Sequence, residues 1–173
     1  MADITALLAA NRDAVDELLR TAEAAAVEDH WTTPRAPGKW SPQQVVEHVA
    51  MAYEEGGNVI AGRPTKLPTL PALVRPLARL MFNRVLKTGK FLKAKTNRDM
   101  DPARAAAPGP ATPAEARTRL DDALSKFAEA CRSRAAAGGK VPSGAFGSVS
   151  LEDYARFTEL HTRHHTHQIP IVL

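Results

Sequence analysis

The chain has a single cysteine, Cys131, and no long apolar run. One thiol excludes an intramolecular disulfide and fits a reducing compartment. No stretch approaches the roughly 18 apolar residues that a membrane-spanning helix needs. The start of the chain also lacks the basic head and apolar core of a secretory signal. We therefore expect a cytoplasmic protein with no membrane contact.

Several common motifs are missing as well. The sequence contains no Gly-rich nucleotide-binding loop, no nucleophile elbow and no internal repeat. No useful length of it alternates apolar and polar residues, so strands are not expected. With 173 residues and 44% hydrophobic content, the chain can build a real core. We expect a single domain over residues 1–173.

Acidic residues are absent from one segment. Between Arg63 and Arg98 there are ten Lys or Arg and no Asp or Glu, which leaves 13 basic and 19 acidic residues elsewhere, a net charge of −6. Such a basic segment could contact nucleic acid, a membrane surface or an anionic substrate. It could equally be a solvated face of a long connection. We favour the solvated face, because the regular aromatic interleaving of single-strand binders is missing, and nucleic-acid binding is not expected.

What the chain does have is helical periodicity in four segments. They cover residues 4–27, 42–60, 113–137 and 151–169. Three of them open on a capping residue: Ser41 with Gln44 as its capping-box partner, Thr112 with Glu115, and Ser150. The predicted core includes Leu18, Val45, Leu124, Phe127, Tyr154 and Phe157. The pattern predicts an all-α protein built around these four helices.

About fifty residues separate the second and third segments. Within them, a further helical piece is indicated by Leu73, Leu77, Leu80, Met81 and Val85, despite Pro76. Residues 102–110 are rich in Ala, Pro and Gly and are expected to form a loop. The bundle is therefore predicted to carry a long crossover between its second and third helices.

Two histidines, His161 and His165, stand four residues apart in the last helix. Residues at i and i+4 share a helix face. At about 100° per residue, both fall near the direction of Tyr154, in the apolar stripe. His164 lies at the margin of that stripe, as a candidate to support the ligands, and His167 points outward to solvent. Burying two imidazoles without partners is costly, so the pair indicates either a metal ion or a hydrogen-bond network.

A third histidine, His48, follows Val45 on the apolar edge of the second helix. Alone it would be a core histidine, but beside the pair it is the natural third ligand. No general base is evident, because Glu47 points about 100° away from His48. Cys131 continues an apolar stripe and is expected to be a core residue. Trp40 could be an N-terminal hydrophobic staple or a lid over a pocket, and we favour the staple.

These residues resemble the DinB-like superfamily of metal-binding four-helix bundles. The similarity lies in Lys39-Trp40-Ser41 leading to Glu47-His48, in His161-x3-His165 followed by Gln168, and in the lead-in from Phe146 to Ser150. In helix order and length it spans nearly the whole chain.

The resemblance implies an up-down-down-up bundle with three histidine ligands, His48, His161 and His165, on a divalent ion. Zinc or nickel suits such nitrogen ligands. It also implies a homodimer and a thiol-dependent transferase or isomerase activity, with a low-molecular-weight thiol as a partner. Because a metal with an open position can activate a thiol or a water molecule, we expect a metal-dependent thiol transferase or hydrolase that acts on a small electrophile. A non-catalytic bundle stabilised by its metal, or a ligand-binding protein, is the alternative.

Overall fold

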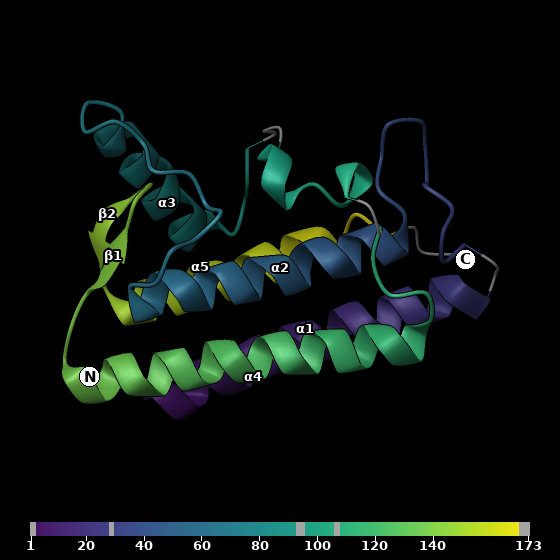
Figure 1. The fold of residues 1–173 in the computed structure, drawn as a ribbon, viewed down its shortest axis with the longest axis horizontal. Coiled ribbons are helices and arrows are strands. Elements are labelled where there is room, and N and C mark those ends of the chain that lie inside the picture. Colours follow the sequence, from purple (N-terminus) through teal and green to yellow (C-terminus); the bar gives the residue numbers. More distant parts are fainter. Residues whose placement is uncertain (1–2, 28–29, 93–95, 106–107, 170–173) are drawn as a thin grey trace.

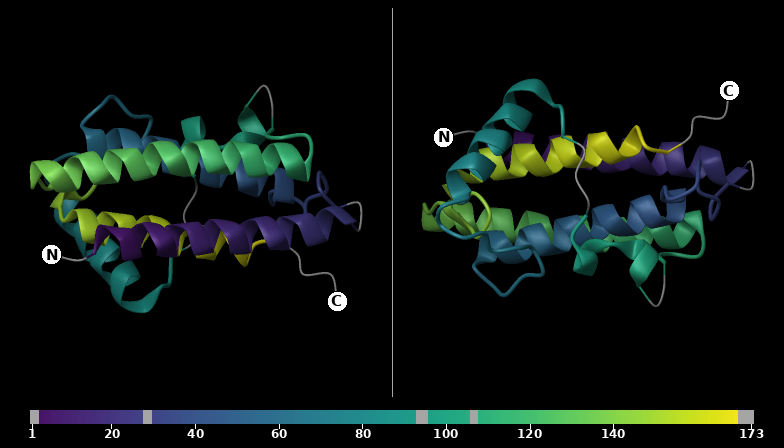
Figure 2. Two further views of the ribbon diagram at one scale, coloured as in Figure 1. Left: turned by 90° about the horizontal axis from the view of Figure 1, so that it is seen from below. Right: turned by 90° about the horizontal axis from the view of Figure 1, so that it is seen from above.

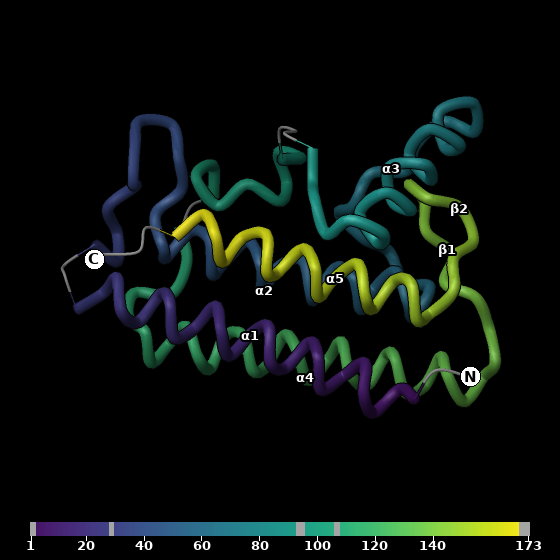
Figure 3. Tube along the Cα trace, turned by 180° about the vertical axis from the view of Figure 1, so that it is seen from behind, coloured from purple at the N-terminus to yellow at the C-terminus, as the bar shows by residue number. Residues whose placement is uncertain are grey.

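The computed structural model describes residues 3–27, 30–92, 96–105 and 108–169. Four long helices form the bundle: α1 (Ile4–Val27), α2 (Pro42–Ala61), α4 (Pro113–Ala137) and α5 (Leu151–Thr166). In Figure 1, α2 and α5 make one layer and α1 and α4 the other; α2 also packs on α4, and α1 on α5. The helices run up, down, down and up along the chain, as Figure 3 shows, so the predicted fold class is confirmed.

The helix boundaries follow from local chemistry. Ser41 accepts a hydrogen bond from the backbone of Gln44, whose side chain accepts one from the backbone of Ser41, so the predicted capping box of α2 is present. Thr112 and Ser150 cap α4 and α5 as predicted. Glu115 differs, because its carboxylate accepts from the backbone of Ala111 rather than completing a box with Thr112.

The long crossover lies over the face made by α2 and α5 (Figure 1). It contains α3 (Arg75–Thr88) and two short 3-10 turns, η1 (Arg98–Met100) and η2 (Pro102–Arg104). The predicted helical piece is therefore confirmed, but its leucines face outward: Leu73, Leu77 and Leu80 are 95%, 60% and 60% exposed. Phe82 and Val85 form the buried face instead. Lys93 and Lys95 of the basic segment lie outside the described residues.

The prediction that the chain has no strands is wrong for one short hairpin. Two three-residue strands, β1 (Val141–Ser143) and β2 (Gly147–Val149), form an antiparallel hairpin between α4 and α5. Three residues are too few to show an alternating pattern in a sequence. The hairpin lies beside α3, as the two further views in Figure 2 also show, and Gly144 accepts a hydrogen bond from the backbone of Leu70. It therefore joins the crossover to the bundle.

The core forms as predicted for Leu18, Val45, Leu124, Phe127 and Tyr154, which are all buried. Phe157 is only half-buried, because it lies at the edge of the bundle among the rings of Phe82, Phe91 and Phe146. Among the described residues, no helix is long and apolar enough to cross a membrane.

Two glycines bring α2 and α4 close together. A Cβ atom at Gly57 would lie 3.4 Å from the Cα of Phe127, and one at Gly56 would lie 3.5 Å from its ring. Both contacts are ordinary van der Waals distances or at their short limit, so larger side chains there would push α4 away. These glycines therefore set the spacing at which Phe127 fills the core against Tyr53, whose ring it meets edge to face at 5.2 Å.

Candidate metal centre

His48 occupies the second turn of α2 and faces the crossover. Its Nδ1 lies 2.8 Å from the carbonyl oxygen of Met100, in η1. A carbonyl only accepts hydrogen bonds, so Nδ1 carries the proton and donates it, which leaves the Nε2 lone pair free. The crossover thus selects the tautomer of His48 and aims one nitrogen at its neighbours on α5.

His161 and His165 lie one turn apart on α5, and their Nε2 atoms are 3.1 Å apart. The Nδ1 of His165 lies 3.1 Å from Oε1 of Gln168. The amide nitrogen of Gln168 lies 3.1 Å from Nε2 of His164. Gln168 therefore donates to His164 and accepts from His165, so the unprotonated Nε2 of His165 faces His161. His164 supports the cluster through Gln168, in the supporting place that the sequence predicted.

The three imidazoles predicted as ligands come together. One nitrogen from each of His48, His161 and His165 lies within 4.8 Å of the other two. The ring centroid of His48 is 5.3 Å from that of His161 and 4.6 Å from that of His165. Within the described residues, no Cys, Asp, Glu or further His joins this group as a fourth member. The arrangement could hold one metal ion and leave a coordination position for another molecule.

Electrostatics keep these rings neutral. Burial lowers the pKa of His48, and the pKa values of His161 and His165 are held well below the usual value, first by burial and then by the neighbouring imidazoles. The hydrogen bond to Met100 and the charge of Asp101 act in the opposite direction on His48. Neutral imidazole is the form that binds a metal ion, so the lowered pKa values favour the metal-binding form of these side chains.

The ring of Trp40 lies against those of His48 and His165, as the alternative role of a lid would require. Its ring centroid is 4.6 Å from that of His48 and 5.8 Å from that of His165. Its indole Nε1 donates to Oδ1 of Asp101 at 3.1 Å. The indole is thus fixed between the crossover and both helices, and it shields one side of the cluster from water.

The other histidines are placed as the sequence indicated. His167 ends α5 and is exposed, and His30 is also exposed. Glu47 faces away from the cluster and pairs with Arg119, whose guanidinium also binds Glu54. Cys131 is a buried core residue, and burial raises its pKa to about 12.

Sequence reasoning missed the crossover's part in the site. The carbonyl of Met100 and the carboxylate of Asp101 have no pattern that would mark them before the chain is folded. Phe91 was missed as well, although its ring lies 5.7 Å from His161 and 4.9 Å from His164. The approach of Gln168 to His165 could have been inferred, because the two are three residues apart at the end of a helix.

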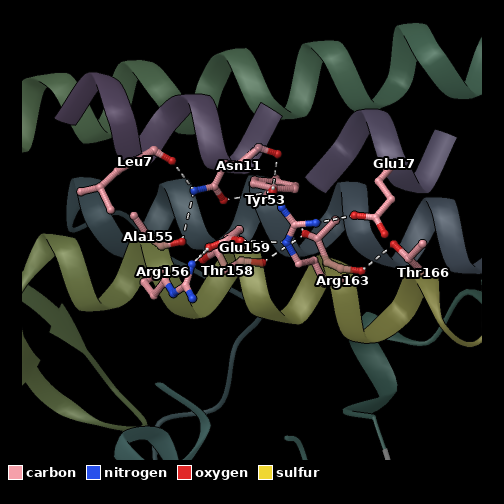
Figure 4. Close-up of polar contacts among 11 residues, drawn as sticks. Leu7, Asn11, Glu17, Tyr53, Ala155, Arg156, Thr158, Glu159, Arg163 and Thr166 are labelled. Carbon is pink, nitrogen blue, oxygen red and sulfur yellow. Dashed lines mark hydrogen bonds and ion pairs between the residues drawn. The ribbon is translucent and has the colours of Figure 1, made fainter. Parts of the chain in front are cut away.

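A buried polar network fixes α5 behind the histidines (Figure 4). The amide of Asn11 donates to the carbonyls of Leu7 and Ala155, and the hydroxyl of Tyr53 donates to Oδ1 of Asn11 at 3.0 Å. Thr162 Oγ1 lies 3.2 Å from that hydroxyl. Because Thr162 directly follows His161, the network holds the ligand-bearing turn in place.

A group of charges continues this network along α5. The carboxylate of Glu159, itself buried, pairs with Arg156 at 2.5 Å and with Arg163 at 2.8 Å, and Arg163 also pairs with Glu17 of α1. A carboxylate so enclosed is compensated by its two partners. It is therefore a structural group and not a free base for the site.

A surface depression of about 510 Å³ lies on the outer side of α4 between Pro110 and Asp122 and is broadly open. It includes none of the histidines. We assign it no role in the chemistry, since it offers no cluster of metal-binding or neutral basic groups.

The sequence matches a known protein family. The model of the DinB superfamily matches residues 7–169, nearly the whole chain. Comparisons with curated proteins and with solved structures find no match.

Proposed function

We propose that this chain, which belongs to the DinB superfamily, is a metal-dependent enzyme that activates a thiol or a water molecule against a small electrophile. His48, His161 and His165 would be the ligands of its divalent ion. The observation that carries the proposal is the convergence of three neutral imidazoles. In two of them, the nitrogen that faces away from the cluster is already engaged by the protein.

The donor set fits such an ion. Three histidine nitrogens with a further position open are typical of catalytic zinc sites, whereas structural sites are closed by four protein ligands. Imidazole also suits nickel. An ion held there would supply Lewis acidity, which lowers the pKa of a thiol or water that it binds and polarises the electrophile.

The protein's own residues orient and shield the site. Met100 and Gln168 fix the rings of His48 and His165, and such outer partners strengthen metal binding in other proteins. Trp40 on one side and Phe91 on another exclude water from the cluster. The basic segment between Arg63 and Arg98 would raise the local concentration of an anionic substrate or thiol, an effect that salt weakens.

A non-catalytic role is the second candidate. The ligands come from α2 and α5, two helices of one layer, so a bound ion would join them and stabilise the bundle. On this view the site needs no open position, and removal of the metal should lower the melting temperature and change nothing else. We further expect a homodimer, because the family resemblance implies one. We expect it in the cytoplasm, because a single cysteine fits a reducing compartment.

The test is His165→Ala with His167→Ala as its control, since His167 is exposed and one turn or less away. Metal content is measured by elemental analysis, folding by circular dichroism, and turnover with a panel of thiol-transfer and hydrolysis substrates. We expect His165→Ala to lose both metal and turnover while keeping the helical fold. Turnover of His165→Ala equal to that of the wild type would refute the enzyme assignment. If the wild type shows no turnover and His165→Ala loses its fold, the structural role of the metal is favoured.

A further inference from the structure

A partly enclosed cavity of about 180 Å³ lies at the end of the bundle where α2 finishes and α5 begins. Its roof is the start of the crossover and the β1–β2 hairpin, which lie together above α2 and α5 in Figure 1. The walls are mainly apolar and include Val59, Leu67, Pro68, Phe146, Tyr154 and Phe157. No charged side chain lines it among the described residues.

Tyr154 supplies an unused polar group in this cavity. Its side chain is 95% buried, and its hydroxyl has no hydrogen-bond partner within the described residues. Every fully enclosed side-chain nitrogen or oxygen in that part of the chain does have a partner. The hydroxyl is therefore not fully enclosed, and Tyr154 is one of the residues that line the cavity.

The hydroxyl is kept in its neutral form. Burial raises the pKa of Tyr154, and the nearby Cys131 thiol and Glu55 carboxylate raise it further. A neutral phenol can both donate and accept a hydrogen bond. Because the hydroxyl is not fully enclosed, a bound molecule with one polar group can form a hydrogen bond to it in place of solvent.

The walls are fixed by specific contacts and are not a gap between loose loops. Glu55, at the end of α2, accepts hydrogen bonds from the hydroxyl of Thr65 and the backbone of Lys66. The backbone of Leu70 donates to Gly144 at 3.1 Å. A Cβ atom at Gly144 would lie 2.6 Å from Oγ1 of Thr69, so a larger residue there would force Thr69 or the hairpin to shift.

We propose that the cavity binds a small, uncharged, largely apolar molecule, of the size of a single aromatic ring, which makes one hydrogen bond to the hydroxyl of Tyr154. An apolar protein cavity of about 150 Å³ can hold benzene, so the volume here suits a ring with a small substituent. A charged ligand is disfavoured, because burial of an unpaired charge among these walls is costly.

This site is separate from the histidine cluster but next to it. Phe157, in the cavity wall, precedes His161 by one helical turn, and its ring lies 5.3 Å from that of Phe91, which in turn contacts His161. Binding in this cavity needs neither a metal ion nor enzyme activity, so it can be tested independently of the proposed function.

Phenol and benzene are suitable probes, with binding followed by NMR chemical shifts of the full chain. We expect both to bind saturably, and their largest shifts should fall on residues of the cavity wall. Tyr154→Phe should weaken the binding of phenol by about 3- to 10-fold, which is the usual contribution of one hydrogen bond. The affinity for benzene should not change. Its matched control is Tyr53→Phe, because the hydroxyl of Tyr53 is already bonded within the core.

A second variant tests the space itself. Ala145 lines the cavity at the turn of the hairpin. Ala145→Leu should therefore fill part of the cavity and weaken the binding of both probes. Ala136→Leu, on the exposed side of α4, is the control for the added side chain. Circular dichroism and melting verify that each variant is folded. The inference is overturned if the probes shift only surface residues, if Tyr154→Phe binds phenol like the wild type, or if folded Ala145→Leu binds both probes unchanged.

Discussion

Substitution of Gln168 isolates the contribution of the residues behind the metal ligands. In the structure Gln168 accepts from Nδ1 of His165 at 3.1 Å and donates to His164 at 3.1 Å. Gln168→Leu keeps a side chain of similar size and removes both hydrogen bonds. His165 then loses the partner that fixes its tautomer and the orientation of its ring.

The expected loss follows from how such partners act. Removal of a hydrogen bond to the rear nitrogen of a ligating histidine typically weakens metal binding by about 10- to 100-fold. That range corresponds to about 1.4 to 2.8 kcal/mol of binding free energy. Gln168→Glu keeps an acceptor oxygen toward His165, so we expect affinity close to that of the wild type. His164→Ala should have a smaller effect than Gln168→Leu, because it acts only through Gln168.

Competition with a chromophoric chelator at fixed pH measures the dissociation constant for zinc and nickel. His167→Ala is the control, because His167 is exposed and adjoins Gln168 in the sequence. Unchanged metal affinity in Gln168→Leu would refute the reasoning. So would an equal loss in Gln168→Leu and Gln168→Glu, since the second retains the acceptor.

Three further outcomes follow from the structure. Tyr53→Phe should lower the free energy of unfolding by about 1–3 kcal/mol, because Oδ1 of Asn11 loses its buried donor; denaturant titration measures this, and a loss below that of Tyr154→Phe would contradict it. Cys131 should resist a thiol reagent at pH 8 in the folded protein and react in denaturant, since burial raises its pKa to about 12; rapid reaction in the native state would show that α4 opens there. The metal-free protein should lose stability as pH falls below about 6.5, because the unfolded chain then binds protons that the buried histidines, with lowered pKa values, do not. A melting temperature that stays level between pH 8 and pH 5 in the presence of chelator would contradict this.

The bundle could be predicted from the sequence because its signals are local. Ser41 with Gln44, and the caps Thr112 and Ser150, act within one helical turn, so they fix the helix starts before any tertiary contact forms. The phase of His161 and His165 is also local, since four residues place both on one face of α5. These features are present in the chain itself, and the structure agrees with them.

The parts that could not be predicted depend on the crossover. Its path decides that the carbonyl of Met100 meets His48 and that Trp40 bonds Asp101 and covers the histidines. Nothing in the spacing of these residues encodes a contact across about fifty positions. The outward direction of the leucines of α3 could not be predicted for the same reason. The sequence of this helix has two apolar faces and does not show which one packs on α5; in the structure it is the face that carries Phe82.

The most direct test of the central claim is X-ray absorption spectroscopy at the metal edge of the protein loaded with one equivalent of zinc or nickel. The proposed site predicts three imidazole nitrogens at about 2.0–2.1 Å for zinc, together with at least one oxygen atom from solvent. His165→Ala should lose this signature, and an added small thiol should introduce a sulfur scatterer in the wild type. A shell of four protein ligands, or a metal signal unchanged in His165→Ala, would contradict the account.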